Sequence, residues 1–410
     1  MDRLKLSRRK DPCVKLARAL YGLPRSGFDW FAKIDNVLTS KLGWSRMPGV
    51  DSVYMKKQAM LALYVDDILL AGPPKDRRRE WALIQEEVKL GEKPAKLSRF
   101  LGVKHSAHDE STYSRTLRTI QDEYAMRIVE QYNAVAPHPA GARMTPAVKI
   151  ASSDEEAGQR AADCRSFVGS LLYLARASRP DISCAVARLA RSVSNWRSGD
   201  DKALEQLVGY VGATAGHALQ SSVDVRDFKA GLWLDLWVDA DHAGEPSRRS
   251  TSGWVLILRG EHGTHMPIDW ASRGQAVVAR SSGEAETVAL HEALRGIVSA
   301  NRGLCASGIP AVDFLERALG RPVPLRVLVD ASVCKAAAEK GSSTRMRYIS
   351  KTQEVDLFWL RDVVHRVGVE LVKVTSAENV ADLLTKPLDG QRTRLLREQI
   401  GVSSATAAEA

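Results

Sequence analysis

Four acidic residues in the second half of the sequence stand where an apolar or helical segment begins or ends. The apolar run 232–238 predicts a strand covered on both faces, and it stops at Asp239. Glu286 falls near the start of a helix after Ser-Ser-Gly, Asp330 follows another apolar run, and Asp382 lies in Ala-Asp-Leu-Leu-Thr-Lys. Carboxylate oxygens are the ligands that hard cations such as Mg²⁺ prefer. The sequence therefore contains an ordered set of four acids at such positions.

Two neighbouring acids leave the first assignment open. Asp241 follows Asp239 after one residue, and Asp235 lies inside the same predicted strand on the same side as Asp239. Asp235 also has a structural alternative, a buried carboxylate paired with an arginine. Asp239 is the preferred first acid of the set, with Asp241 and Asp235 as its rivals and Asp235 the less favoured of the two.

Helical geometry distinguishes Glu286 from Glu284. At 100° per residue, the apolar residues Ala289, Leu290 and Ala293 lie within about 60° of Glu286, whereas Glu284 falls about 160° away. A carboxylate on a core-facing stripe costs several kcal/mol unless it is paired or binds a cation. We expect Glu286 to face the metal site and Glu284 to face away. The structural alternative for Glu286 is a buried bond to an arginine.

A second acidic pair, Asp66 and Asp67, lies between short apolar runs at 60–64 and 68–71. This pattern predicts a β-hairpin with acids at its tip. Asp is also common in turns that bind nothing, so the pair alone is weak evidence for a metal site.

The composition predicts a globular protein that binds a polyanion. The chain has 410 residues, 44% hydrophobic and 26% charged, and its net charge is +10 because 59 basic residues exceed 49 acidic ones. This excess favours nucleic acid as a partner, although an evenly basic surface gives the same sum. The five cysteines lack zinc-site spacing, which predicts reduced thiols in an intracellular protein, cytoplasmic or nuclear. No apolar run reaches the roughly 20 residues of a membrane span, so no membrane association is expected.

Several motifs together resemble the Pol polyproteins of copia-type retrotransposons. Asp-Ala-Asp, Arg-Ser-Thr-Ser-Gly, Ser-Ser-x-Glu-Ala-Glu and Ala-Asp-x-x-Thr-Lys-Pro-Leu are similar to the ribonuclease H domain of this family. Upstream, Leu-Tyr-Gly-Leu-Pro, Tyr-Val-Asp-Asp and Arg-Pro-Asp-Ile resemble its reverse transcriptase and connection segments. The resemblance covers roughly residues 12–390, and the family order of the motifs makes it specific.

The resemblance and the order of predicted elements imply an α/β (α+β) chain in four parts. Strands alternating with helices predict a mixed sheet in the third part, and a polar stretch at 220–229 forms its boundary. The expected parts are a truncated reverse transcriptase palm and thumb at 1–135, a linker with connection helices at 136–229, a ribonuclease H-like domain at 230–395 and a disordered tail at 396–410.

The resemblance also implies an activity. Asp239, Glu286, Asp330 and Asp382 would converge at one sheet edge, hold two Mg²⁺ ions, with Mn²⁺ as a substitute, and cleave the RNA of RNA–DNA hybrids. Recognition would rest on the shape and sugar–phosphate backbone of the hybrid. Basic residues beside the acidic motifs are candidates for phosphate contacts, or else form a solvated basic face: Arg248, Arg249, Arg280, Lys335, Arg345, Arg347, Lys351 and Lys386.

The chain departs from the family pattern at two sites. The polymerases of this family use a further Asp on a strand that would lie before Met1, so we expect Asp66 and Asp67 to form an incomplete polymerase site. In the ribonuclease H part, Ala331 follows the third acid where the family often has Asn, and His365 is the only histidine between Asp330 and Asp382. A histidine proton shuttle is therefore expected to be missing, which would slow cleavage.

Three hypotheses follow for the whole chain. The first is a metal-dependent ribonuclease H joined to a truncated polymerase. The second is a catalytically inactive retroelement remnant that binds nucleic acid, and the third is a mis-cut fragment of a full polyprotein with RNA-directed DNA polymerase activity. Association with other Pol products would fit any of them, and the oligomeric state is open.

Overall fold

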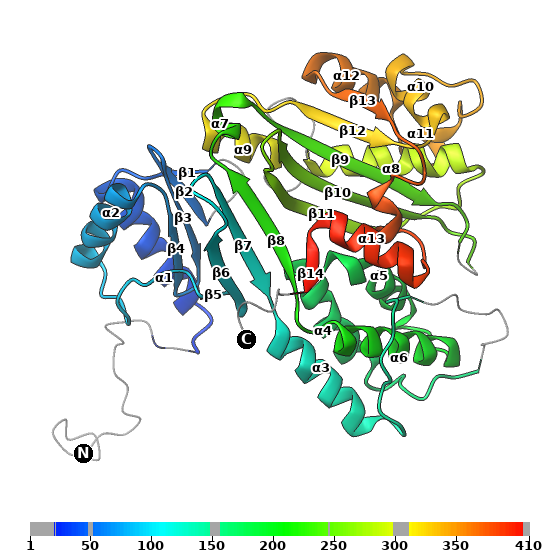
Figure 1. The fold of residues 1–410 in the computed structure, drawn as a ribbon, viewed down its shortest axis with the longest axis horizontal. Coiled ribbons are helices and arrows are strands. Elements are labelled where there is room, and N and C mark those ends of the chain that lie inside the picture. The colour runs from blue at the N-terminus through cyan, green and yellow to red at the C-terminus, as the bar shows by residue number, and fades with distance from the viewer. Residues whose placement is uncertain are drawn as a thin grey trace, which may run out of the picture. The chain divides into compact units, whose positions relative to one another are not determined.

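The computed structural model describes residues 20, 22–47, 52–147, 156–244, 247–297 and 311–404. The chain divides into two compact units, Met1–Lys96 and Leu97–Ala410, and Figure 1 shows their helices and strands. Each unit is built around its own sheet.

The first unit is an antiparallel sheet with two helical segments. Its strands, in both spatial and chain order, are β1 (Ser45–Arg46), β2 (Val53–Lys56), β3 (Ala59–Tyr64) and β4 (Asp67–Ala71). The helical segments are α1 (Ser26–Asn36), which continues into the π-helical turn η2 (Val37–Lys41), and α2 (Pro74–Glu87). Ile34, Leu61 and Ile84 are fully buried between these elements. The predicted hairpin is confirmed, since Tyr64 pairs with Asp67 across a two-residue turn.

The second unit contains a sheet of ten strands. Nine of them follow the order β13-β12-β9-β10-β11-β8-β7-β6-β5, and β14 pairs with β8 beside this path. The strand bounds are β5 Arg99–Phe100, β6 Val103–Asp109, β7 Ser114–Ile120, β8 His217–Asp224, β9 Leu232–Asp241, β10 Thr251–Gly260, β11 His265–Gly274, β12 Leu325–Val329, β13 Glu370–Lys373 and β14 Val402–Ser404.

Strands β9 to β13 form the mixed sheet that the sequence predicts for 230–395. β9, β10 and β11 are antiparallel neighbours, whereas β12 pairs parallel to β9 and β13 parallel to β12. The α/β fold class is therefore confirmed. Both faces of β10 are buried, because Leu256 faces one hydrophobic core and Val255 and Ile257 face the other. Continuous apolar runs are what such doubly covered strands require.

Helices cover each face of this mixed sheet. On one face α8 (Ser282–Ile297) contacts β9 and β10, and α10 (Ser332–Lys340) contacts α8 and α12 (Leu357–Val367). On the other face η5 (Val380–Leu384) contacts β9 and β10 and is followed by α13 (Gly390–Ile400). The remaining short helices of this part are α7 Asp227–Ala230, α9 Ala311–Leu319 and α11 Ile349–Thr352.

The connection helices surround a separate core and a buried ion pair. They are α3 Asp122–Val135, α4 Cys164–Ala177, η3 Pro180–Ile182, α5 Ser183–Ser192 and α6 Ser198–Ala213. Arg179 and Asp181 are almost wholly buried and form two hydrogen bonds of 2.9 and 2.8 Å. Tyr210 donates to the same Asp181 carboxylate, and Arg397 of α13 donates to the Tyr210 hydroxyl. The Arg-Pro-Asp motif therefore ties the connection helices to the last helix.

The expected boundary before residue 230 does not match the fold. The sequence predicts a polar boundary at 220–229, yet α6 ends at Ala213 and the strand β8 spans His217–Asp224. The polar residues of β8 are strand residues because β7 pairs on one side and β11 and β14 on the other. Strands β6 and β7, which the sequence grouped with 1–135, join the second unit through the same pairing.

The expected disordered tail at 396–410 is also corrected over its described part. Helix α13 continues to Ile400, and Gly401 reverses the chain with φ at +102°. Val402–Ser404 then form β14, which pairs antiparallel with β8. A strand of three residues leaves almost no periodic signal in a sequence, whereas its pairing depends on residues far away in the chain.

Candidate metal site

Three carboxylates meet at the end of β9. Asp239 lies on β9, Asp330 directly follows β12, and Glu286 lies in the first turns of α8. One ligand oxygen from each falls within 4.8 Å of the others. The two aspartates are neighbours because β9 and β12 are parallel, with Trp237 level with Leu328. We call these three residues the acid triad.

Glu286 is the member of the acid triad whose burial is least compensated by the protein. Its side chain is only 7% exposed, and Oε2 is buried without a hydrogen-bond partner in the described structure. Burial, reinforced by the charges of Asp239 and Asp330, raises the pKa of Glu286 to about 9. A buried, uncompensated carboxylate costs free energy that a bound cation would recover. The all-oxygen donor set suits a hard divalent ion such as Mg²⁺ or Mn²⁺.

Asp239 is held by the η5 segment. The Thr385 hydroxyl donates to its Oδ2, and Lys386 Nζ lies 3.3 Å from the same oxygen. Burial raises the pKa of Asp239 to about 6, and Lys386 limits the rise. Although burial disfavours the charged ammonium, Asp239 and Asp382 together raise the pKa of Lys386, so it is a cation at neutral pH.

Asp382 lies next to the acid triad but is not part of it. Lys386 Nζ donates to its Oδ1 at 2.7 Å, and Arg392 lies 3.4 Å from its Oδ2. Lys386 therefore stands between Asp382 and Asp239. The structure brings three of the four predicted ligands together and gives the fourth two cationic partners.

The rivals of Asp239 have other partners. Asp235 forms ion pairs with Arg326 at 2.7 Å and Arg259 at 3.7 Å, which is the structural alternative that the sequence suggested. Asp241 forms an ion pair with Arg188 at 3.1 Å. Asp239 is thus the β9 acid that joins the acid triad.

Glu284 corrects an expectation. It lies outside the acid triad, but it does not face away from the protein: only 1% of the residue is exposed. Its carboxylate accepts hydrogen bonds from Tyr348 Oη, Gln353 Nε2 and the backbone N–H of Arg280, each at 3.0 Å. The Arg280 guanidinium lies 4.0 Å from the centre of the Tyr348 ring. These partners lie outside α8, so helical geometry alone could not reveal them.

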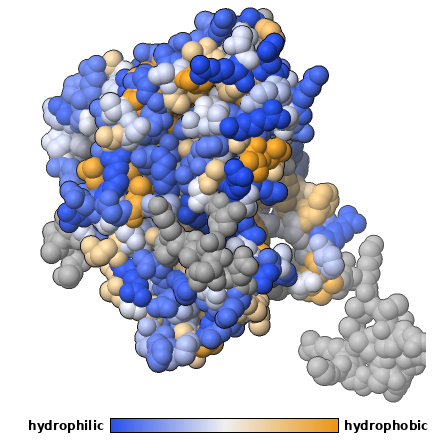
Figure 2. All heavy atoms as spheres, turned by 90° about the vertical axis from the view of Figure 1, so that its right-hand side faces the viewer, coloured by the Kyte–Doolittle hydropathy of each residue, from blue (hydrophilic) through white to orange (hydrophobic). Residues whose placement is uncertain are grey.

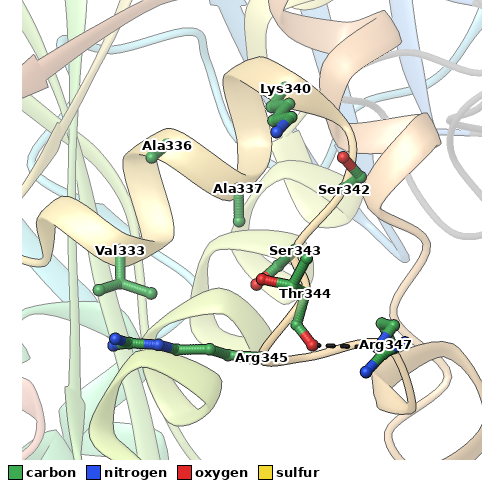
Figure 3. A pocket seen from close by; sticks show the side chains of 9 residues that line it. All are labelled: Val333, Ala336, Ala337, Lys340, Ser342, Ser343, Thr344, Arg345 and Arg347. Atoms are coloured by element: carbon green, nitrogen blue, oxygen red, sulfur yellow. Dashed lines mark hydrogen bonds between the residues drawn. The ribbon is translucent and has the colours of Figure 1, made fainter.

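The eight predicted basic residues do not share one environment. Lys386 is within the acidic cluster, and Lys335 pairs with Glu339 and donates to a backbone carbonyl. Arg345 and Arg347 line a cavity of about 450 Å³ between α10 and the loop that follows it. Figure 3 shows Arg345 extending along α10 toward Val333, while Arg347 donates to the Thr344 carbonyl. The other four residues are exposed: Arg248, Arg249, Arg280 and Lys351.

One face of the molecule is largely polar. On the face shown in Figure 2, hydrophilic side chains predominate and hydrophobic ones form small separate patches. Among the residues with described structure, no helix has both the length and the apolar composition needed to cross a bilayer.

The hairpin acids of the first unit stand apart from any such cluster. Asp66 and Asp67 are exposed at the β3–β4 turn, where Val65 has φ at +53°. Over the part of the chain that the structure describes, no further acid, histidine or cysteine joins them in a group that could hold an ion. In the second unit, His365 is the only histidine in the sequence between Asp330 and Asp382. Its ring forms a hydrogen bond with the backbone carbonyl of Glu339 on α10.

Comparisons with known proteins agree with the motifs. Residues 4–147 match the model of the family described as reverse transcriptase (RNA-dependent DNA polymerase). The chain is 27% identical over 414 residues to the Retrovirus-related Pol polyprotein from transposon TNT 1-94 of Nicotiana tabacum, covering 97% of this chain and 28% of that protein. The chain belongs to the reverse transcriptase family of retrotransposon Pol polyproteins.

Two further relatives match different shares of this chain. The Retrovirus-related Pol polyprotein from transposon RE1 of Arabidopsis thaliana is 27% identical over 397 residues, which are 95% of this chain and 25% of that protein. The uncharacterized mitochondrial protein AtMg00810 of the same plant is 31% identical, over 56% of this chain and 89% of its own length. The chain described here spans about a quarter of the length of the TNT 1-94 and RE1 polyproteins.

Proposed function

We propose that this chain cleaves the RNA strand of RNA–DNA hybrids at the acid triad, using divalent metal ions held by Asp239, Glu286 and Asp330. The observation that carries the proposal is the buried, unpartnered oxygen of Glu286 beside two more carboxylates. Two of these three crowded acids are buried and the third is half-buried, so keeping all of them ionised is costly without a compensating cation. When bound, such an ion stabilises the charge of a phosphate and lowers the pKa of a coordinated water.

The protein's own contribution is to hold the acids in place. Thr385 and Lys386, the two residues that directly follow η5, both contact Asp239. Asp330 accepts a hydrogen bond from Ser376 at 2.7 Å, which orients one of its oxygens. Glu286 is placed by α8, whose apolar side chains pack against β9 and β10. Rigid strands and helices therefore position all three carboxylates.

Basic side chains near these elements would receive the nucleic acid. The exposed residues Arg280 and Lys351 belong to the segments that meet around Glu284, two residues before Glu286. Their charges would neutralise phosphates, and the resulting counterion release makes binding depend steeply on salt. A hybrid would be distinguished by its 2′-hydroxyls and groove shape rather than by base edges.

We further propose that this polypeptide does not polymerise DNA by itself. The support is that Asp66 and Asp67 have no additional clustered ligand among the described residues. Two-metal phosphoryl transfer needs carboxylates that bridge ions about 3.5–4 Å apart. A pair of exposed acids on a hairpin is an incomplete version of that site.

The test is cleavage of end-labelled RNA in a hybrid by the full chain. Cleavage is expected with Mg²⁺ or Mn²⁺ and not with Ca²⁺ or EDTA, because the smaller ions meet the octahedral geometry of phosphoryl transfer. Asp239→Asn should reduce the rate by at least about 10³-fold, an effect comparable to losing a transition-state contact, and Asp382→Asn should also reduce it strongly.

Asp235→Asn is the matched control. It makes the same change four residues earlier on the same side of β9, but it removes a partner of Arg326 instead of an acid-triad ligand. Cleavage per folded molecule should persist in this variant. Undiminished cleavage in EDTA, or in Asp239→Asn, would rule out the proposed function.

A further inference from the structure

Lys386 forms ion pairs with both Asp239 and Asp382, and no other side chain of the described residues does so. Its Nζ lies 3.3 Å from Asp239 Oδ2 and 2.7 Å from Asp382 Oδ1. About a third of the side chain is exposed, while the two carboxylates are almost completely buried. The ammonium therefore closes the space between the acid triad and the fourth acid.

The local sequence accounts for this position. Asp382 and Lys386 are four residues apart, at the 3-10 turn η5 and just beyond it, so their side chains lie on the same side. Thr385 bonds to Asp239 at the same time. One short segment thus delivers an acid, a hydroxyl and an ammonium to the end of β9.

Charge balance within this group points to a single divalent ion. When ionised, Asp239, Glu286, Asp330 and Asp382 carry four negative charges, and Lys386 and Arg392 cancel two of them. Two negative charges are left, which is the charge that one divalent cation neutralises. A second divalent ion between Asp239 and Asp382 would have to displace the ammonium or lie against it, and like charges at such distances repel.

We infer that the substrate-free chain binds one divalent cation tightly, in the acid triad, and that the Lys386 ammonium occupies the place of a second ion between Asp239 and Asp382. This inference rests on the proposed metal site but departs from the two-ion expectation. Lys386 then neutralises the carboxylates of Asp239 and Asp382 inside the site. It is not a phosphate contact or part of a solvated basic face, the two roles that the sequence suggested for it. Arg392 supports it by neutralising the far oxygen of Asp382.

The test counts ions by titrating the full chain with Mn²⁺ and measuring free Mn²⁺ by electron paramagnetic resonance. The native chain should bind one Mn²⁺ ion tightly. The Kd of any second ion should be at least about tenfold higher, a difference of about 1.4 kcal/mol in binding free energy. Lys386→Met should bind two ions of comparable affinity, because the space between the aspartates is then free of positive charge. Lys386→Arg should restore the count of one.

The control is Lys229→Met, which removes an exposed lysine of α7 and should leave the count at one. Circular dichroism reports whether each variant is folded. If Lys386→Met is not folded, Lys386→Gln, which also removes the positive charge, takes its place in the ion count.

The outcomes separate this inference from the proposed function. Two tight ions in the native chain, or one ion in folded Lys386→Met, would overturn the role of Lys386 and leave the metal site standing. Failure of the native chain to bind any ion would overturn the metal site itself.

Discussion

Replacing Glu286 by glutamine removes one charge from the acid triad while keeping the volume of the side chain. Burial, with Asp239 and Asp330, raises the pKa of Glu286 from its ordinary value of 4.5 to about 9 in the metal-free fold. At pH 7 the carboxyl is therefore ionised in the unfolded chain and protonated in the folded one. The stability it contributes is fully present below about pH 4.5 and is lost as the pH rises toward 9.

The size of this loss of stability follows from the thermodynamic linkage between protonation of Glu286 and folding. Between pH 4.5 and pH 7, at about 1.4 kcal/mol for each pH unit, the loss of folding free energy is roughly 3 kcal/mol. Glutamine carries no such proton. Glu286→Gln should therefore be more stable than the native chain by up to about 3 kcal/mol at pH 7, and by less than about 1 kcal/mol at pH 5.

Glu284→Gln is the matched comparison, because it makes the same change two residues earlier in α8. Its carboxylate accepts three hydrogen bonds, and an amide would turn a donor toward some of those donors. This variant should lose about 1–3 kcal/mol. The same substitution on one helix thus has opposite effects on stability.

Urea unfolding in EDTA, followed by circular dichroism at pH 5 and pH 7, measures both changes. Adding Mg²⁺ should then raise the urea midpoint of the native chain more than that of Glu286→Gln, since the ion binds the folded state. If the native chain and Glu286→Gln show parallel pH dependence, Glu286 is not in a crowded acidic cluster. Loss of stability in Glu286→Gln would refute the sign of the argument.

Three further outcomes follow from the same structure. Arg179→Met should cost about 3–5 kcal/mol in urea unfolding, because it leaves Asp181 as a buried unpaired charge; a loss below about 1 kcal/mol would contradict the buried ion pair. The full chain should not extend a DNA primer, and template-dependent incorporation that disappears in Asp66→Asn would show that the hairpin acids suffice. Binding of an RNA–DNA hybrid should weaken steeply between about 50 and 200 mM salt, whereas salt-independent binding would argue against phosphate contacts.

The parts of the fold that the sequence predicts are those with strong local patterns. Strand β9 is read from its unbroken apolar run, because burial on both faces demands apolar residues at nearly every position. The placing of Asp239 and Asp330 side by side follows from parallel pairing of the strands they end. Glu286 stands out because a charged residue interrupts an apolar stripe.

The parts that could not be predicted depend on partners far along the chain. Glu284 is buried by Tyr348 and Gln353, which are 64 and 69 residues away, so its own helix contains no sign of the contact. The polar residues of β8 resemble a linker until β7 and β14 pair with them. Lys386 resembles a basic surface residue until Asp239 is brought to it by the sheet.

The pairing of β14 with β8 has a consequence for how the protein is made. The ribosome synthesises β8 long before β14, which comes after every other strand of the sheet. During that interval part of β8 has an open edge, and unpaired strand edges invite pairing with other chains. Nascent chains interrupted before Val402 should therefore depend on chaperones to avoid aggregation. The open edge of β8 is paired only after β14 has left the ribosome.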